Sequence, residues 1–199
     1  MTDRRDVGKD TGSSAATAAR DAAAERIRAA HARSVEAVRL RPARAMGTAV
    51  ARVAVTDGMT CEVVEGPYRL VVDMPERLGG NGRGPNPGVY GRASLGACLA
   101  MTYVRWAAEN DLPIRRLEVE IEADYDARGE LGVDDGVTPA YTQVRYTVAV
   151  ETDAPEEEVR RVFDYADRTC PYLHVWTDPL DLRRQLRITR PADAERAGG

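Results

Sequence analysis

Apolar and polar residues alternate along the chain between residues 48 and 74, the period of β-strands, in which successive side chains face opposite sides. Asp57-Gly58 and Gly66-Pro67 interrupt the pattern with residue pairs that are typical of tight turns. In the last run, one set of alternate side chains is more apolar, so one face of that strand is expected to be better buried. The pattern therefore predicts a three-stranded antiparallel meander, with strands at residues 48–56, 60–65 and 68–74.

A helical pattern runs from about Gly88 to Asn110, after a loop rich in glycine and proline at residues 75–87. The loop lacks the GxxxxGK[ST] spacing, so it is not interpreted as a phosphate-binding loop. Each glycine inside a helix costs about 1 kcal/mol relative to alanine, a loss that the close approach of a neighbouring backbone can offset. We therefore expect a buried central helix with a tight contact at its small residues, which are Gly91, Ala93, Ser94, Gly96, Ala97 and Ala100.

Two longer runs, at residues 116–126 and 141–152, have the clearest strand pattern and are expected to pair as a hairpin. The first run places five acidic side chains on one face and apolar side chains on the other. Paired carboxylates can serve acid–base chemistry, but strict alternation explains this acidic face as the solvated side of a sheet.

Pro155 opens a further helix with three glutamates in its first turn, where the helix dipole favours anions. Its apolar stripe, extended by four residues from Ala166, reaches Cys170, which is expected to point toward the core. Residues 180–188 are predicted to form a final strand. Strands thus occur in groups rather than alternating with helices, which indicates an α+β fold with mainly antiparallel sheet.

The composition divides the chain into four parts. Residues 15–46 are dense in alanine and predict a helical extension, whose thin apolar stripe must pack against something to be stable. It could pack across a dimer, cover the site or dock on a partner. The predicted organisation is a disordered tail at 1–14, the extension at 15–46, the main domain at 47–188 and a disordered tail at 189–199.

Charge and hydropathy exclude several classes of partner. The net charge is −4 and no dense basic stripe interleaves with aromatic residues, so no nucleic-acid binding is expected. No apolar run approaches the roughly 20 residues that cross a bilayer, so no membrane association is expected. The N-terminus lacks an apolar signal segment and carries several acidic residues, which predicts a cytoplasmic protein. Three widely spaced cysteines do not suit a secreted disulfide framework and are interpreted as core residues, metal ligands or reactive thiols.

Two segments together resemble the OsmC/Ohr superfamily: "DMPERLGGNGRGPNPGVYGRASLGACLAMT", which starts at Asp73, and "RVFDYADRTCP", which ends at Pro171. The resemblance spans about residues 47–188 and implies an intertwined homodimer with antiparallel sheets wrapped around two central helices. It also implies thiol-dependent reduction of organic hydroperoxides and peroxide without a cofactor. Cys98 would be the peroxidatic thiol and Cys170 the resolving thiol. The two would form a disulfide that an external dithiol reduces.

The sequence departs from this family at two positions. The hydroperoxidase branch has an arginine at the turn between the first two strands, where this chain has Met59. It also has a glutamate just after the Asn-Pro of the loop, where this chain has Gly88 and Val89. A second interpretation is therefore a non-catalytic, redox-sensing or small-ligand-binding protein on the same fold.

Peroxide reduction needs a thiolate, so a cation or base is expected to assist Cys98. Cys98 lies about 15 Å into its helix at the standard rise, too far for the helix dipole to act. The candidate supporting side chains are Arg105, Arg92, Arg83 and His174. No CxxC or HxxxH spacing supports a zinc site, and Cys61, outside both matching segments, is interpreted as inert.

Overall fold

The computed structural model describes residues 11–188, so the predicted tail at 189–199 and most of that at 1–14 lie outside the described residues. The helices are α1 (Thr11–Leu40), α2 (Pro87–Glu109), α3 (Ala127–Glu130), α4 (Glu156–Thr169) and α5 (Pro171–Thr177). The strands are β1 (Arg52–Asp57), β2 (Thr60–Glu65), β3 (Tyr68–Val72), β4 (Arg116–Tyr125) and β5 (Tyr141–Glu151). Two short 3₁₀ helices, Pro42–Ala45 and Glu76–Leu78, lie in the connections.

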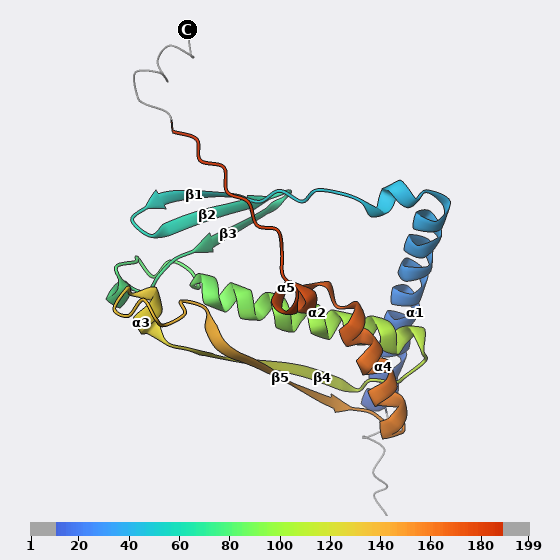
Figure 1. Ribbon diagram of the computed structural model, residues 1–199. Coiled ribbons are helices and arrows are strands. Elements are labelled where there is room, and N and C mark those ends of the chain that lie inside the picture. The colour runs from blue at the N-terminus through green and yellow to red at the C-terminus, as the bar shows by residue number, and fades with distance from the viewer. Residues whose placement is uncertain (1–10, 189–199) are drawn as a thin grey trace, which may run out of the picture.

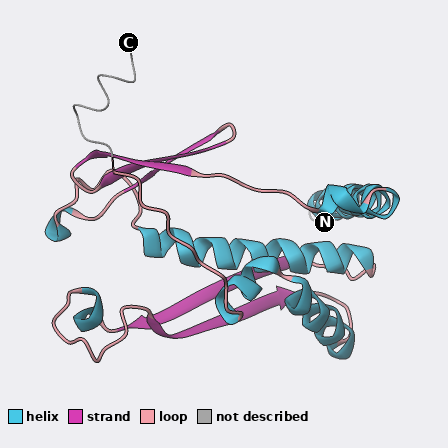
Figure 2. Ribbon diagram, turned by 45° about the horizontal axis from the view of Figure 1, so that its top comes forward, coloured by secondary structure: helices cyan, strands magenta, loops and turns pink. Residues whose placement is uncertain are grey.

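The helix α2 lies between two separate antiparallel sheets (Figures 1 and 2). One sheet is the meander β1-β2-β3 and the other is the hairpin β4-β5. This arrangement confirms the α+β prediction, the central helix and both predicted sheets. Within residues 11–188, no helix combines the length and hydropathy that a bilayer crossing requires.

The start of α2 is fixed by its loop. The side chain of Asn86 caps the helix by accepting the backbone N–H of Val89 at 3.1 Å, and Pro87 occupies the first turn. Further along, a Cβ added at Gly96 would lie 3.2 Å from Cγ1 of Ile121 in β4. The predicted close approach at the small residues of α2 is therefore a contact with the hairpin.

The hydrophobic core lies where α2 meets α4 and the inner face of the β4-β5 hairpin. Leu95, Leu99 and Tyr103 of α2 are buried there beside Ala166 and Cys170. The acidic face of β4 points outward, as the alternation predicts. There Arg145 of β5 hydrogen-bonds Asp124, which lowers the pKa of that carboxyl despite partial desolvation.

The prediction of a strand at residues 180–188 is wrong. This segment pairs with neither sheet, and Leu182 is 95% exposed. An alternating pattern becomes a strand only where another strand accepts its hydrogen bonds, and the described part of the chain offers none here.

The better-buried face expected for β3 is likewise not covered, because Tyr68 is 70% exposed and Leu70 is exposed too.

The helix α1 packs on the C-terminal half of α2 (Figure 2). Arg28 donates to the carbonyl of Ala108 at 3.0 Å and pairs with Asp111 at 2.6 Å. His31 lies 3.0 Å from the carboxylate of Glu109. The thin stripe of α1 thus gains polar contacts as well as apolar ones. The division between this extension and the main domain near residue 47 stays a prediction.

Candidate functional site

The structure brings together two of the three cysteines, 72 residues apart in the chain. Cys98 lies in the middle of α2, and Cys170 lies between the end of α4 and the start of α5. Their sulfur atoms are 3.6 Å apart, with the thiol of Cys170 donating to the sulfur of Cys98. Both cysteines are free. One chain therefore supplies both sulfurs at a separation from which a disulfide forms with a small movement.

The position of Cys170 is set by the end of α4. Tyr103 of α2 donates to one carboxylate oxygen of Asp167 at 2.5 Å, and Tyr146 of β5 donates to the other at 3.1 Å. These bonds hold α4 against α2 and β5 one turn before the cysteine. Burial and the neighbouring carboxylate raise the pKa of Tyr103, so it remains a hydrogen-bond donor. Cys170 then takes an extended conformation and Pro171 starts α5.

Sequence reasoning missed this Tyr–Asp–Tyr cluster. No local signal identifies it, because its three members come from three elements that meet only in the folded chain.

The two thiols have different environments. Cys170 is 0% exposed, and burial raises the pKa of its thiol, with the neighbouring Cys98 sulfur raising it further. The backbone N–H of Leu173 and the hydroxyl of Thr102 act on this pKa in the opposite direction. Cys98 is only half-buried. Of the pair, Cys98 is thus the sulfur that a molecule from solvent reaches more easily.

Two of the predicted supporting residues lie on α2 itself. Among the described contacts, Arg105 reaches the cysteine pair only through Thr102. The hydroxyl oxygen of Thr102 lies 3.5 Å from a guanidinium nitrogen of Arg105, and its O–H donates to the carbonyl of Cys98 at 2.7 Å. Arg92 donates to the hydroxyl of Tyr141 at 2.7 Å. The described hydrogen bond of Arg92 is therefore to a side chain of β5 and not to either sulfur.

The other two predicted supporting side chains have partners elsewhere. A guanidinium nitrogen of Arg83 lies 3.5 Å from the carboxylate of Asp57, beside the turn that carries Met59. His174 hydrogen-bonds Asp178 at 2.8 Å, which raises the pKa of the histidine, and its other ring nitrogen lies 3.1 Å from a backbone carbonyl. Among the described contacts, neither side chain touches Cys98 or Cys170.

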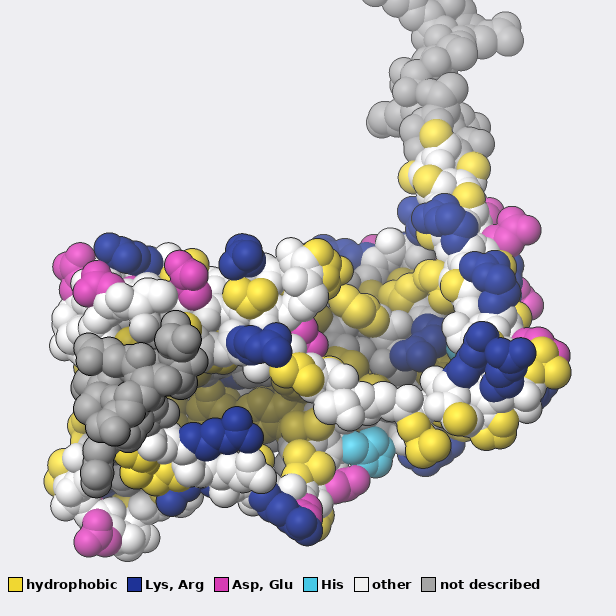
Figure 3. All heavy atoms as spheres, turned by 90° about the horizontal axis from the view of Figure 1, so that it is seen from above, with side chains coloured by type: hydrophobic (Ala, Val, Ile, Leu, Met, Phe, Trp, Pro, Cys, Tyr) yellow, Lys and Arg dark blue, Asp and Glu magenta, His cyan; other side chains and the backbone are white. Residues whose placement is uncertain are grey.

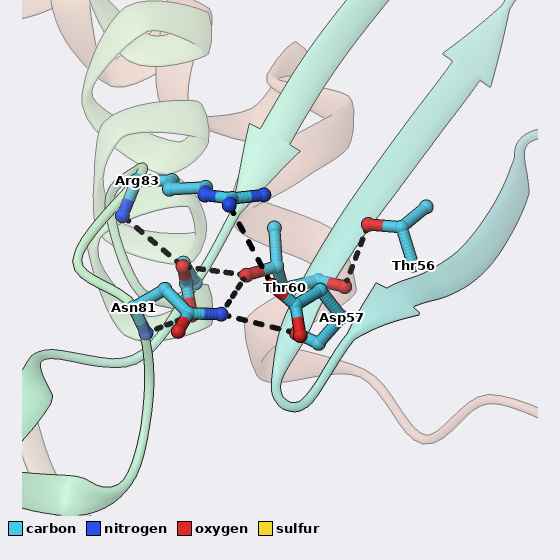
Figure 4. Close-up of polar contacts among 6 residues, drawn as sticks. Thr56, Asp57, Thr60, Asn81 and Arg83 are labelled. Carbon is cyan, nitrogen blue, oxygen red and sulfur yellow. Dashed lines mark hydrogen bonds and ion pairs between the residues drawn. The ribbon is translucent and has the colours of Figure 1, made fainter.

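A buried carboxylate, also missed from the sequence, orders the loop before α2. Asp73 accepts hydrogen bonds from the hydroxyl of Thr60 and from the backbone N–H groups of Met74, Asn81 and Arg83, at 2.8 to 3.3 Å. Figure 4 shows how Thr60, Asn81 and Arg83 converge there. Burial disfavours the charged form of Asp73, but the four bonds together lower its pKa. The carboxylate therefore acts as a structural acceptor that connects the meander to the loop.

The cysteines do not form part of a larger ligand cluster. Within residues 11–188, no group of three or more histidine, cysteine, aspartate or glutamate side chains is arranged to hold a metal ion. Cys61 lies on β2, with its sulfur 3.8 Å from the carbonyl of Met59. It belongs to the meander, whereas the cysteine pair lies in the core formed by α2, α4 and the β4-β5 hairpin.

The sequence model of the family described as OsmC-like protein matches residues 79–183, which is more than half of the chain. This chain belongs to the OsmC-like family. The match confirms the family that the two segments resemble, and it includes both cysteines. No curated protein sequence matches the chain.

Solved structures of this family share the fold. An OsmC-like protein from Mycoplasma pneumoniae superimposes with a TM-score of 0.57 at 14% identity, covering 66% of this chain and 89% of that one. An OsmC-like protein of unknown function from Vibrio cholerae gives a TM-score of 0.53 at 11% identity, covering 65% and 94%. An organic hydroperoxide resistance protein from Elizabethkingia anophelis gives 0.50 at 18% identity, covering 67% and 90%.

Proposed function

We propose that this OsmC-like protein reduces organic hydroperoxides with the Cys98–Cys170 pair. The observation that carries the proposal is the 3.6 Å separation of the two sulfurs inside the core. Membership of the OsmC-like family supports a peroxide-related redox role, and one structural neighbour is an organic hydroperoxide resistance protein.

The proposed reaction has three steps. The Cys98 thiolate attacks the terminal peroxide oxygen, the O–O bond breaks, and the alkoxide takes a proton to leave as the alcohol. The resulting sulfenic acid condenses with the thiol of Cys170, which forms the S–S bond and releases water. An external dithiol then reduces the disulfide by exchange and is itself oxidised.

The different environments of the sulfurs support the order of these steps. Cys98 is the more accessible sulfur, and it accepts the S–H of Cys170. Cys170 is fully buried and its raised pKa keeps it protonated until a neighbour reacts. We therefore assign the attack to Cys98 and the resolution to Cys170.

We further propose that the protein works as a homodimer. Val53, Val55 and Tyr68 expose apolar side chains on the meander, with Val55 69% exposed. On α2, Val89 and Met101 are exposed, the latter at 69%. Figure 3 shows that this side of the molecule is hollowed and has hydrophobic side chains in the hollow. A second copy, carrying the same apolar surfaces, would cover both the meander and α2.

A redox-sensing role without turnover is the alternative. It is favoured because this chain lacks the arginine and the glutamate of the hydroperoxidase branch. Met59 is exposed at the turn where the arginine is expected, and Gly88, where the glutamate is expected, lies in the first turn of α2. A sensor would form the same disulfide but react slowly with peroxide.

Rapid mixing of the reduced protein with cumene hydroperoxide tests the proposal. We expect peroxide consumption together with the loss of two thiols per chain. Cys61→Ser is the matched control and should react like the wild type, whereas Cys98→Ser should not consume peroxide. Cys170→Ser should stop at the sulfenic acid, which dimedone traps. Unchanged consumption by Cys98→Ser would refute the enzymatic role, and slow, single-turnover oxidation would favour the sensor.

A further inference from the structure

The helix α2 carries the first cysteine of the pair and also two side chains that anchor the segment before the second. Tyr103 donates to the carboxylate of Asp167 at 2.5 Å, and the indole N–H of Trp106 donates to the hydroxyl of Thr169 at 2.7 Å. Tyr103 and Trp106 are three residues apart, so they are neighbours on the surface of the helix. Their partners precede Cys170 by three residues and by one residue. One helix therefore carries one sulfur and fixes the end of α4 that leads to the other.

Asp167 is the charged member of these anchors. Its carboxylate also accepts the hydroxyl of Tyr146 on β5 at 3.1 Å, so it connects α4 to both α2 and the hairpin. The bond from Tyr103 is shielded from water, since Tyr103 is 1% exposed and stacks on Phe163 of α4 with ring centroids 4.4 Å apart. Hydrogen bonds to an ionised acceptor are about twice as strong as those between neutral groups. The backbone N–H of Cys170 donates to the carbonyl of Asp167 at 3.2 Å, so the cysteine follows the position of this residue.

The distance between the sulfurs makes this anchoring relevant to the chemistry. Closing the disulfide brings the sulfurs from 3.6 Å to about 2.05 Å, so most of the approach is made before the reaction begins. A misplacement of about 1 Å in a reacting group can cost about 100-fold in rate. On the other side of Cys170, Pro171 starts α5, and no residue of α5 is buried. The end of α4 is therefore the better supported of the two segments that hold this sulfur.

We infer that Asp167 is a positioning residue for the resolving sulfur, with Tyr103 and Tyr146 as the groups that hold its carboxylate. Among the described contacts, this carboxylate touches neither sulfur, and it acts by fixing the end of α4 so that Cys170 stays within reach of Cys98. The inference rests on the proposed function, because it concerns the resolving step of the same site. In that step the S–S bond forms, and the proton of Cys170 leaves with the hydroxyl of the sulfenic acid as water.

The charge of Asp167 and its anchoring have opposite expected effects on this step. A nearby carboxylate opposes a negative charge on a sulfur, so removal of the charge alone should make Cys170 attack faster. Removal of the anchor should make the attack slower at every pH, because the sulfur spends less time in reach of its target. The sign of the effect of Asp167→Asn therefore separates a positioning role from an electrostatic one.

Disulfide exchange with Ellman's reagent isolates this step without peroxide. In a Cys61→Ser background, Cys98 attacks the reagent and releases one thionitrobenzoate. Cys170 then attacks the sulfur of Cys98 in the mixed disulfide, which forms the internal disulfide and releases a second thionitrobenzoate and a proton. The two releases are followed by absorbance as separate phases, and the second phase is measured against pH.

Asp167→Asn should leave the first phase unchanged and slow the second phase about 10-fold or more at every pH. Tyr146→Phe removes one bond and no charge, and it should slow the second phase several-fold. Tyr141→Phe is its matched control, because it removes a bond at 2.7 Å from Arg92 to the same strand that does not involve α4. The control should react like the wild type.

The equilibrium of the cysteine pair with dithiothreitol gives a second measurement. In Asp167→Asn the equilibrium constant for disulfide formation should fall about 10-fold, which is about 30 mV for this two-electron couple, because the reduced sulfurs are no longer held together. Leu112→Ala controls for a general loss of stability, since Leu112 is 5% exposed in a separate core cluster with Val159 and Val162. It should change neither the second phase nor this equilibrium.

A second phase in Asp167→Asn that is as fast as or faster than that of the wild type would overturn the inference. Equal slowing in Tyr141→Phe or Leu112→Ala would overturn it as well. If Asp167→Asn does not fold, Tyr146→Phe decides, and an unchanged second phase there refutes the role of the anchor. Failure of peroxide turnover alongside the expected exchange phases would refute the proposed function and leave the role of Asp167 standing.

Discussion

Oxidation of the cysteine pair should stabilise the protein by an amount that follows from the chain separation. A disulfide between Cys98 and Cys170 closes a loop of 72 residues. The loop-entropy relation gives a stabilisation of about 4 kcal/mol at 25 °C for a loop of this length. The sulfurs must approach from 3.6 Å to the S–S bond length of about 2.05 Å, and the associated backbone adjustment offsets part of this gain. We therefore expect a net increase of about 2–4 kcal/mol in the free energy of unfolding.

Urea unfolding of the Cys61→Ser protein, oxidised with diamide or kept reduced with dithiothreitol, measures this difference. Both samples must have the same protein concentration, because a dimer adds a concentration-dependent contribution to stability. For a chain of this size, the expected gain corresponds to a rise of about 4–16 °C in melting temperature. Cys98→Ser and Cys170→Ser should unfold identically with and without oxidant.

An oxidised protein that has lost both thiols but unfolds at the same or a lower urea concentration would refute this reasoning. It would mean that the cysteine pair cannot close without distorting the core around Leu99 and Ala166, which are both fully buried beside it. An oxidant-dependent gain in the Cys98→Ser protein would equally refute it, because the stabilisation would then arise elsewhere.

Four further measurements follow from the same packing and electrostatics. Leu99→Ala should lower the free energy of unfolding in urea by about 2–5 kcal/mol, since Leu99 is fully buried. Asp167→Asn should cost about 1–3 kcal/mol in the same assay by weakening two tyrosine hydrogen bonds, whereas the exposed Asp164→Asn should cost nothing measurable. Burial raises the pKa of Cys170, so above about pH 8.5 the unfolded chain releases a proton that the folded chain holds. The stability of the reduced protein should therefore fall as pH rises through that range, and Cys170→Ser should flatten the slope. Met101 is exposed on the surface that we propose as the dimer interface, so Met101→Lys should shift the protein toward the monomer in sedimentation velocity if that proposal holds.

The sequence predicts most of the elements, because their signals are local. The alternation in β4 and β5 specifies both the pairing and the buried face, and the observed strands, Arg116–Tyr125 and Tyr141–Glu151, differ from the predicted runs by one residue at one end. The glycines of α2 indicate a close contact before its partner is known, and Gly96 against Ile121 is that contact. The position of Cys170 on the core side of α4 also follows from helical spacing alone.

The supporting side chains could not be predicted in the same way. Helical spacing places Arg105 on the face of Cys98, but it does not show that Thr102 stands between them. Arg83 and His174 carry suitable chemistry, yet each is bound by an aspartate close to it in the fold. The strand expected at residues 180–188 fails for a related reason, since a pairing partner is a property of the fold and not of the segment.

The extension α1 and the cysteine pair are connected through one side chain. Trp106 of α2 has an edge contact with the ring of His31, with ring centroids 5.3 Å apart. Its indole N–H also donates to the hydroxyl of Thr169 at 2.7 Å, one residue before Cys170. Trp106 therefore contacts α1 on one side and hydrogen-bonds the end of α4 on the other. That end of α4 positions the sulfur of Cys170. The packing of α1 on α2 is therefore connected to the position of this sulfur through Trp106, although no side chain of α1 has a described contact with either sulfur.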